Sequence, residues 1–373
     1  MDHAGRRARL TAALAELGVD AALVTAGQNV TYLTGVVSSN AALLVRGDGS
    51  AVLATDDRYA SAAAQTCPDV EVVTARAVAA ALAEAAAQSG GRLGVERHHV
   101  TLAQSDAIIE SAGGRLDLVD LAMAVEDLRA VKAPAEVALV AEACDISVRA
   151  LSALLEGRLI GRTERQIARD LEARMLRLGA DALAFDTIVA SGPNGAVPHH
   201  SPSDREVRAG ELVTIDFGAK VGGYHADCTR TVLVGGAGEA WQHEVYDLVA
   251  RAQRAGVAAL APGRSVGEID AAAREVIVEG GYGDFFVHGL GHGVGLAIHE
   301  PPWLMSSESA AGTLPMRTTV TVEPGIYLPG KGGVRIEDTT DVGPAGVRVL
   351  TDMTTDLLVV DEARMSQWRR RTT

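Results

Sequence analysis

Two segments of the chain have the form of glycine-centred β-hairpins with an acidic side chain in each arm, and this pattern constrains the fold more than any other. In the first, residues 212–232, a turn about Val221 and Gly222 places Asp216 directly opposite Asp227. Two carboxylates across a ladder repel each other unless a positive charge lies between them. Asp216 interrupts an apolar run, which favours a buried carboxylate that requires a cation; two solvated surface aspartates are the alternative.

The second segment, residues 320–338, repeats this arrangement. Its β-like arms flank a glycine-rich turn, and a turn centred on Gly330 places Glu323 opposite Glu337. Arg335 lies two residues from Glu337 and therefore on the same face of the strand. A solvated Glu–Arg pair would explain this segment by itself, but two opposed acidic pairs in one region favour a shared site.

Three of the ten histidines fall within residues 288–299, at His288, His292 and His299. Glycines at every second position from 289 to 295 would let the backbone close tightly around a ligand. A nucleotide-binding loop is excluded because the G-x-G-x-x-G spacing is not met. The pair His199-His200 lies in a further loop rich in glycine and proline, and is a weak signal when taken alone.

The hydrophobic pattern predicts an α/β domain at residues 1–127 and an α+β domain at residues 128–373. In the first, the turn Gly47-Asp48-Gly49 indicates a hairpin. The strands expected there are 21–24, 41–45, 51–54, 70–73 and 93–95, with a helix within 75–88. In the second, Pro134 and the capping box Thr163-x-x-Gln166 mark helix starts. The helices expected there are 134–155, 163–178, about 239–260 and 266–279.

Composition places the chain among globular proteins and excludes several partners. Hydrophobic residues make up 47% and charged residues 22%, with 34 Lys and Arg against 48 Asp and Glu for a net charge of −14. This acidity argues against nucleic acid as a partner. No apolar run approaches the roughly 20 residues of a membrane span, and we expect no signal peptide. The 3 widely spaced cysteines indicate reduced thiols in a cytoplasmic protein.

One motif match is rejected. Residues 263–267 fit G-x-S-x-G, the nucleophile elbow of serine hydrolases, but that motif requires a preceding strand, and here a helical stretch and Ala261-Pro262 come first. The sequence predicts instead that Ser265 and Glu268 form a capping box.

The two acidic pairs and a histidine form a mostly oxygen donor set, sufficient for two divalent ions. Such a set suits Mn²⁺ or a similarly hard cation. Two ions about 3.5–4 Å apart can share a hydroxide nucleophile and stabilise an oxyanion. A carboxylate can carry the proton to a leaving amine. The residue chemistry therefore indicates metal-assisted hydrolysis.

The complete motif series resembles that of the pita-bread metallopeptidases. The motifs occur in family order as Asp216-Phe217-Gly218, Asp227-Cys228-Thr229-Arg230-Thr231, His288 to His299, Glu323-Pro324-Gly325 and Arg335-Ile336-Glu337-Asp338. Residues 191–200, and Leu33-Thr34-Gly35 with Asn40, are similar to the aminopeptidase P and prolidase branch. The resemblance extends over essentially the whole chain.

The resemblance implies a ribonuclease-H-like N-terminal domain of the creatinase type, followed by a pita-bread catalytic domain. It implies five ligands for two divalent metal ions: Asp216, Asp227, His292, Glu323 and Glu337. The expected ion is Mn²⁺, with Co²⁺ or Zn²⁺ as alternatives. Glu323 would also act as a proton shuttle, and Arg335 would orient the ligands. Three histidines would bind substrate and stabilise the tetrahedral intermediate: His199, His288 and His299.

The implied activity is that of a cytoplasmic, homodimeric Xaa-Pro aminopeptidase acting on proline-containing peptides. A prolidase, which cleaves only dipeptides, stays open because the difference depends on how the N-terminal domain limits the cleft. A metal-dependent enzyme of another class on the same scaffold, such as a lyase, and a binding protein that retains only the fold are further alternatives. The complete ligand set disfavours a creatinase-like hydrolase and an inactive scaffold.

Overall fold

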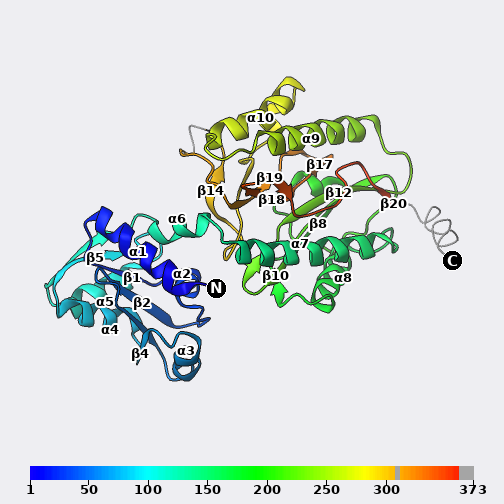
Figure 1. Cartoon of the computed structure of the whole chain (residues 1–373). Helices are drawn as coiled ribbons and strands as arrows, with labels where there is room; N and C mark the ends of the chain where they lie inside the picture. Colours follow the sequence, from blue (N-terminus) through cyan, green and yellow to red (C-terminus); the bar gives the residue numbers. More distant parts are fainter. Residues whose placement is uncertain (307–310, 361–373) are drawn as a thin grey trace. The chain divides into compact units, whose positions relative to one another are not determined.

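The computed structural model of the chain describes residues 1–306 and 311–360 (Figure 1). It divides into two compact units, the first ending at Arg129 and the second beginning at Ala130. The boundary expected between residues 127 and 128 falls just before this division. Within the described ranges, no helix has both the length and the apolar character needed to cross a bilayer.

The first unit is built on a mixed six-stranded sheet of order β4-β3-β2-β1-β5-β6. β1 pairs with β2, and β2 with β3, in antiparallel fashion, and the other pairs are parallel. The strands are β1 (Ala21–Val24), β2 (Ala41–Arg46), β3 (Ala51–Thr55), β4 (Glu71–Thr74), β5 (Gly91–Val95) and β6 (Leu116–Asp120). The helices are α1 (His3–Leu17), α2 (Gly27–Thr34), α3 (Ala60–Thr66), α4 (Val78–Ala87), α5 (Leu102–Ala112) and α6 (Ala124–Ala130).

The strands and the hairpin expected in this unit are confirmed. β2 and β3 pair across the turn at Gly47-Asp48-Gly49, where Gly49 has a φ of 86° that favours glycine. The alanine-rich helix expected within residues 75–88 forms α4, which packs Leu82 and Ala83 against the sheet. The core of this unit consists mainly of alanine, valine and leucine side chains.

Within its described residues, 130–306 and 311–360, the second unit has four long helices, which agree closely with the expected spans. They are α7 (Pro134–Leu155), α8 (Glu164–Arg177), α9 (Ala240–Ala259) and α10 (Val266–Glu279). The capping box of Thr163 and Gln166 at the start of α8 is confirmed. The one predicted for α10 is wrong: Ser265 occupies the N-cap position without a side-chain capping bond. Glu268 lies beside the guanidinium of Arg264 instead, at 3.7 Å, and the exposed carboxylate is thus drawn to a side-chain cation.

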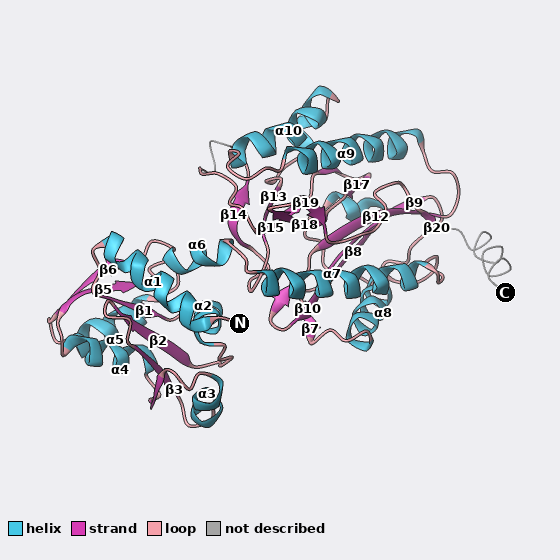
Figure 2. Ribbon diagram, in the orientation of Figure 1, coloured by secondary structure: helices cyan, strands magenta, loops and turns pink. Residues whose placement is uncertain are grey.

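The strands of the second unit lie mostly between α9 and α7, and two of them, β7 and β10, lie beyond α7 beside α8 (Figure 2). They form sheets of order β11-β10-β7, β20-β12-β9-β8, β14-β13-β15-β18-β19 and β16-β17. Their bounds are β7 (Ala182–Leu183), β8 (Ile188–Ser191), β9 (Glu211–Phe217), β10 (Ala219–Val221), β11 (Tyr224–His225), β12 (Cys228–Val234), β13 (Gly291–Gly293), β14 (Glu300–Leu304), β15 (Thr318–Val322), β16 (Gly325–Leu328), β17 (Gly332–Arg335), β18 (Asp338–Gly343), β19 (Gly346–Val349) and β20 (Val359–Val360). The described part of the unit also contains the 3₁₀ turns η1 (Gly192–Ala196) and η2 (Gly283–Phe285).

The register predicted for the first acidic hairpin is wrong. Asp216 pairs with Thr229, and not with Asp227. The turn residues are Gly222 and Gly223, with φ values of 55° and 86°. A two-residue hairpin turn favours positive φ at both central positions, which two glycines adopt without strain and valine does not. The turn therefore lies one residue later than expected, and every pairing shifts by two residues.

The register of the second acidic hairpin is confirmed. β16 and β17 pair Gly325 with Arg335 and Leu328 with Gly332, so the turn is centred on Gly330 as expected. Outside this ladder, β15 and β18 continue the same register with Val322 opposite Asp338. Glu323 and Glu337 thus lie between two ladders, each one residue from a paired strand end.

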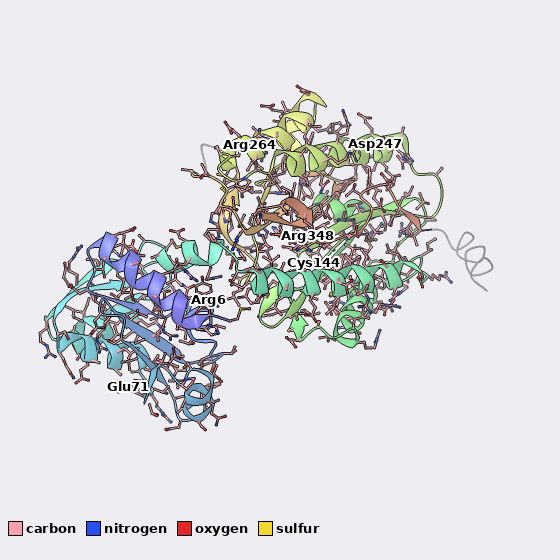
Figure 3. The ribbon with its side chains drawn as sticks, viewed as in Figure 1. Arg6, Glu71, Cys144, Asp247, Arg264 and Arg348 are labelled. Atoms are coloured by element: carbon pink, nitrogen blue, oxygen red, sulfur yellow. The ribbon has the colours of Figure 1, made fainter. Side chains whose placement is uncertain are left out.

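The cysteines agree with the expectation of reduced thiols. All three, Cys67, Cys144 and Cys228, are free and buried. Cys144 lies on α7 (Figure 3). Cys228 is fully buried, and burial raises the pKa of its thiol well above the ordinary value, which keeps it protonated and supports a packing role.

Candidate metal centre

One cavity of about 440 Å³ in the second unit brings the expected site residues together. It is lined by all of them: His199, Asp216, Asp227, His288, His292, His299, Glu323, Arg335 and Glu337. They are spread over more than a hundred residues of the sequence, from His199 to Glu337. The cavity is also lined by side chains that sequence reasoning did not single out, among them Phe185, Asp186, Trp303 and Met305.

The five expected ligands form overlapping groups whose donor atoms lie within 4.8 Å of one another. One group is Asp216, Asp227 and Glu337, and a second is His292, Glu323 and Glu337. A third joins His299 to Asp227 and His292, although His299 was expected to bind substrate. Glu337 belongs to the first two groups and therefore links them.

The β ladders hold the four carboxylates in place. Asp216 is in β9, Asp227 immediately precedes β12, and Glu323 and Glu337 follow β15 and β17. Asp216, Asp227 and Glu337 are 8%, 5% and 1% exposed. Because these residues sit in or beside hydrogen-bonded strands, their backbone is fixed by pairing and not by contacts within the site.

His292 is held by the glycines around it, in a way that differs from the sequence interpretation. A Cβ atom at Gly291 would lie 2.1 Å from the carbonyl oxygen of Thr321, and one at Gly293 would lie 2.2 Å from that of Pro301. Alternate glycines therefore let β13 approach the neighbouring strands, and the tight closure is around backbone and not around a ligand.

The negative charges of this cluster are only partly compensated by the protein. Burial raises the pKa of Asp216, Asp227 and Glu337, and the neighbouring carboxylates raise it further. Among the described residues, Arg335 is the one that lowers the pKa of all three carboxyl groups. Its Nη2 donates to Asp216 Oδ2 at 2.7 Å. The second oxygen of Glu337, Oε2, accepts from the hydroxyl of Thr229 at 2.6 Å.

Two oxygens of this cluster have no partner among the described residues. Asp216 Oδ1 and Glu337 Oε1 are buried and accept no hydrogen bond. A buried carboxylate oxygen without a donor is costly, and several in one like-charged cluster are more so. These atoms fit divalent cations bound by oxygen, because such ions need acceptors without protons and supply the missing positive charge.

Glu323 and His292 form an ion pair at the centre of the cluster. Nε2 of His292 lies 3.3 Å from Glu323 Oε1 and 3.7 Å from Asp227 Oδ2. Burial raises the pKa of Glu323, but the hydrogen bond and charge of His292 lower it to about 2. Burial lowers the pKa of His292, and the contact with Glu323 more than reverses this. A metal requires the neutral ring, so metal binding here would release a proton.

Tyr327 is a site residue that sequence reasoning missed. Its hydroxyl accepts from Arg335 Nη1 at 2.9 Å and lies 2.9 Å from His288 Nε2. The carbonyl of Gly289 can only accept, so Nδ1 of His288 carries a proton, and burial lowers the pKa of the ring, which favours the neutral form whose Nε2 accepts from the hydroxyl of Tyr327. His288 is then neutral, with its proton on Nδ1 and directed to the carbonyl of Gly289 at 2.8 Å. The sequence did contain a signal for this residue, because Tyr327 lies two positions after Gly325 on the strand that pairs with the strand of Arg335.

The flanking histidines are less enclosed than the expected ligands. His199 and His299 are exposed, whereas His292 is 8% exposed and stacks edge-on against His299 at 4.4 Å between ring centroids. The carbonyl of Pro198, next to His199, accepts from Arg335 Nη1 at 3.2 Å. Arg335 therefore contacts both Asp216, an expected ligand, and the loop that carries His199.

Comparison with known proteins identifies the family. The model of "Metallopeptidase family M24" matches residues 138–343, more than half of the chain, and that of "Creatinase/Prolidase N-terminal domain" matches residues 6–131. The chain belongs to metallopeptidase family M24. A relative in Bacillus subtilis, named only as an uncharacterized peptidase, is 38% identical over 92% of this chain and 97% of its own.

Solved structures confirm the fold of this M24 protein. An Xaa-Pro dipeptidase from Bacillus anthracis has a TM-score of 0.88 at 33% identity and covers 96% of this chain and 99% of its own. An X-Pro aminopeptidase from Thermotoga maritima has a TM-score of 0.85 at 35% identity, over 95% of this chain and 99% of its own. The expected architecture, a creatinase-type N-terminal domain followed by a pita-bread domain, is thus confirmed.

Proposed function

We propose that this M24 protein is a metal-dependent Xaa-Pro aminopeptidase that hydrolyses the bond between an N-terminal residue and a following proline. The observation that carries the proposal is the convergence of five metal-ligating side chains in one cavity with two buried oxygens lacking donors. The names of its structural relatives, an Xaa-Pro dipeptidase and an X-Pro aminopeptidase, support the substrate class.

Two divalent ions, with Mn²⁺ as the first candidate and Co²⁺ or Zn²⁺ as alternatives, would be held by the five clustered side chains. When bound, such a pair supplies an activated water and positive charge for the carbonyl oxygen under attack. The residues proposed as ligands are Asp216, Asp227, His292, Glu323 and Glu337. The mainly oxygen donors and the shared position of Glu337 support two ions over one.

Other side chains of the cavity have proposed roles in proton transfer and substrate placement. Glu323 is the proton shuttle to the departing amine, because it is less enclosed than the other three carboxylates and contacts a histidine that can exchange protons. His199 and His299 are exposed at the cavity and would contact the peptide. Arg335 holds Asp216, and His288 acts through Tyr327, to which its Nε2 is bonded.

A dipeptidase is the second candidate, because the B. anthracis structure is that of an Xaa-Pro dipeptidase. A relative in Pyrococcus furiosus, also called an Xaa-Pro dipeptidase, is 44% identical over 63% of this chain and 66% of its own. The two candidates share the same chemistry and differ in the length of peptide admitted. They are separated by comparing turnover of Xaa-Pro with that of Xaa-Pro-Yaa-Zaa.

The experiment is a metal-titrated assay on a small peptide panel. The metal-stripped protein is reloaded with Mn²⁺, Co²⁺ or Zn²⁺ and assayed for release of the first residue from peptides with proline or alanine in second place. We expect release that depends on Mn²⁺ and on proline. Absence of release with all three ions would refute the proposal, and cleavage confined to the dipeptide would favour the second candidate.

We further propose a homodimer, which the family resemblance supports, located in the cytoplasm, which the three free cysteines support. Light scattering at several protein concentrations tests the first part of this proposal, and fractionation of cells tests the second.

A further inference from the structure

Glu164 is a fully buried carboxylate whose hydrogen bonds all go to one loop. It is the first residue of α8, and its side chain is 0% exposed. Oε1 accepts from the backbone N–H of Ser191 at 2.8 Å, from its hydroxyl at 2.7 Å and from Asn194 at 2.9 Å. Oε2 accepts from His200 at 2.8 Å and from the backbone N–H and hydroxyl of Ser203 at 3.0 and 2.6 Å.

These bonds fasten both ends of residues 191–203, the loop that carries His199 to the cavity. The backbone N–H of Glu164 itself donates to the carbonyl of Arg205, and that of Arg165 to the carbonyl of Ser203, so the loop exit is bonded to the start of α8. Between these ends, the carbonyl of Pro198 accepts a hydrogen bond from Arg335, which lines the cavity. Glu164 therefore fastens both ends of the segment that carries His199, and Arg205, whose Nη1 donates to the hydroxyl of Ser191 at 2.7 Å, supports the first end.

The hydrogen-bond donors around the side chain of Glu164 require an ionised carboxylate. Burial raises the pKa of Glu164, but the hydrogen bonds of Ser203, Ser191, His200 and Asn194 lower it to about 2. Each oxygen faces one backbone N–H, which cannot reverse its direction as a hydroxyl can. An amide in place of the carboxylate must direct its NH₂ group at one of these two N–H groups, so glutamine breaks half of the network while retaining the shape.

We propose that Glu164 is a positioning residue of the site, which acts on the reaction by holding His199 in place. The inference rests on the proposed function, because the role of His199 is that of a group contacting the peptide. Glu164 does not itself line the cavity. Its effect on catalysis must therefore pass through the loop, and a misplacement of about 1 Å in such a group costs roughly 10²-fold in rate.

The test is a double-mutant cycle with Glu164→Gln and His199→Ala, assayed with the Mn²⁺-loaded protein on an Xaa-Pro peptide. We expect Glu164→Gln to lower kcat/KM by about 10²-fold, mainly through kcat, with unchanged metal content. In the His199→Ala background the same change should have little further effect. Asp170→Asn is the matched control, since Asp170 lies on the same helix and bonds only Arg162 and Arg174 among described side chains; it should retain full activity.

A full effect of Glu164→Gln in the His199→Ala background, or a fall in melting temperature with activity unchanged, would overturn the proposal. Glu164→Asp provides a second variant if the glutamine protein does not fold: it retains the charge and should recover part of the activity. Should the wild-type protein cleave no Xaa-Pro peptide, the proposed function fails, but hydrogen exchange still tests the positioning. Faster exchange across residues 191–203 in Glu164→Gln than in Asp170→Asn supports it, and equal exchange refutes it.

Discussion

The four carboxylates of the site and its two exposed histidines are held by different means. The carboxylates lie in or beside paired strands, and three of them are nearly inaccessible to solvent. His199 and His299 lie on loops, and each is followed by a residue that is fastened to a buried charge. His200 bonds Glu164, and Glu300, next to His299, pairs with Lys132 at 2.9 Å with both side chains at most 3% exposed.

The carboxylates and the two histidines are held differently because their roles impose different requirements. Two cationic partners, Arg335 and His292, offset part of the repulsion among the four carboxylates. The rest is borne by the paired strands and the apolar core beneath them. A residue that meets an incoming peptide must be accessible, and a loop provides this at the expense of backbone pairing. A buried charge next in sequence restores a fixed position without enclosing the histidine itself.

The largest expected effect is that of Asp227→Asn on the carboxylate cluster. Loss of a ligand should lower Mn²⁺-dependent activity by at least about 10³-fold, because several kcal/mol of transition-state stabilisation disappear. Metal analysis and the peptide assay measure this. Asp247→Asn, an exposed change on α9 (Figure 3), is the control and should leave both unchanged.

The same variant should stabilise the metal-free protein. The pKa of Asp227 is raised in the folded state, by burial first and then by Glu337 and Asp216. An acid with a raised folded pKa disfavours folding above its unfolded pKa, near 3.9, so the penalty is absent at lower pH and grows as pH rises from about 4 toward 7. The advantage of Asp227→Asn in melting temperature should increase over this range. An advantage that shrinks would contradict the electrostatic account.

How much of this could be read from the sequence depended on whether local or tertiary information was needed. The start of α7 and both ends of α10 were placed to the residue, because Pro134 and Gly280-Gly281 are local signals of a helix start and a helix end. The acidic side chains inside apolar runs were equally local. The register of the first hairpin failed on a one-residue choice of turn, and with it the opposition of Thr229 to Asp216 was missed.

The residues that hold the site in place from outside, Glu164, Lys132 and Tyr327, could not be inferred from the sequence. Nothing in the sequence around each of them indicates which side chain it contacts. Glu164 begins a helix, where an acidic residue is common for reasons of helix polarity alone. Lys132 contacts a residue 168 positions later, and Tyr327 joins Arg335 of β17 to His288 of the loop before β13. Such pairings are decided by the packing of distant elements.

A large effect on stability is expected from Lys132→Met at the base of the His299 loop. It removes the cation beside buried Glu300 and should lower the free energy of unfolding by about 3–5 kcal/mol. The double variant Lys132→Met/Glu300→Gln should recover part of this loss, since no buried charge then remains at the pair. Chemical denaturation measures both. A double variant less stable than Lys132→Met would show that the charge of Glu300 is satisfied by other means.

His299→Ala separates two roles for a histidine that lies near both ligands and cavity. If it contacts the peptide, kcat/KM should fall by about 10²-fold while metal content and affinity stay at wild-type values. Its placement within 4.8 Å of Asp227 and His292 makes the alternative testable in the same preparation. A parallel loss of metal affinity would assign His299 to the ligands and place it with the carboxylates in the comparison above.

The smallest effect is expected from Tyr327→Phe, which removes one hydroxyl between Arg335 and His288. Burial raises the pKa of Tyr327 to about 12, so the group is a neutral donor at all working pH values. Without it, Nε2 of His288 loses its donor and the ring is free to change tautomer, for an expected loss of about tenfold in kcat. Nitrogen NMR of the imidazole should show the Nδ1-protonated form in the wild type and a mixture in the variant. An unchanged tautomer with full activity would mean that the carbonyl of Gly289 alone fixes the ring.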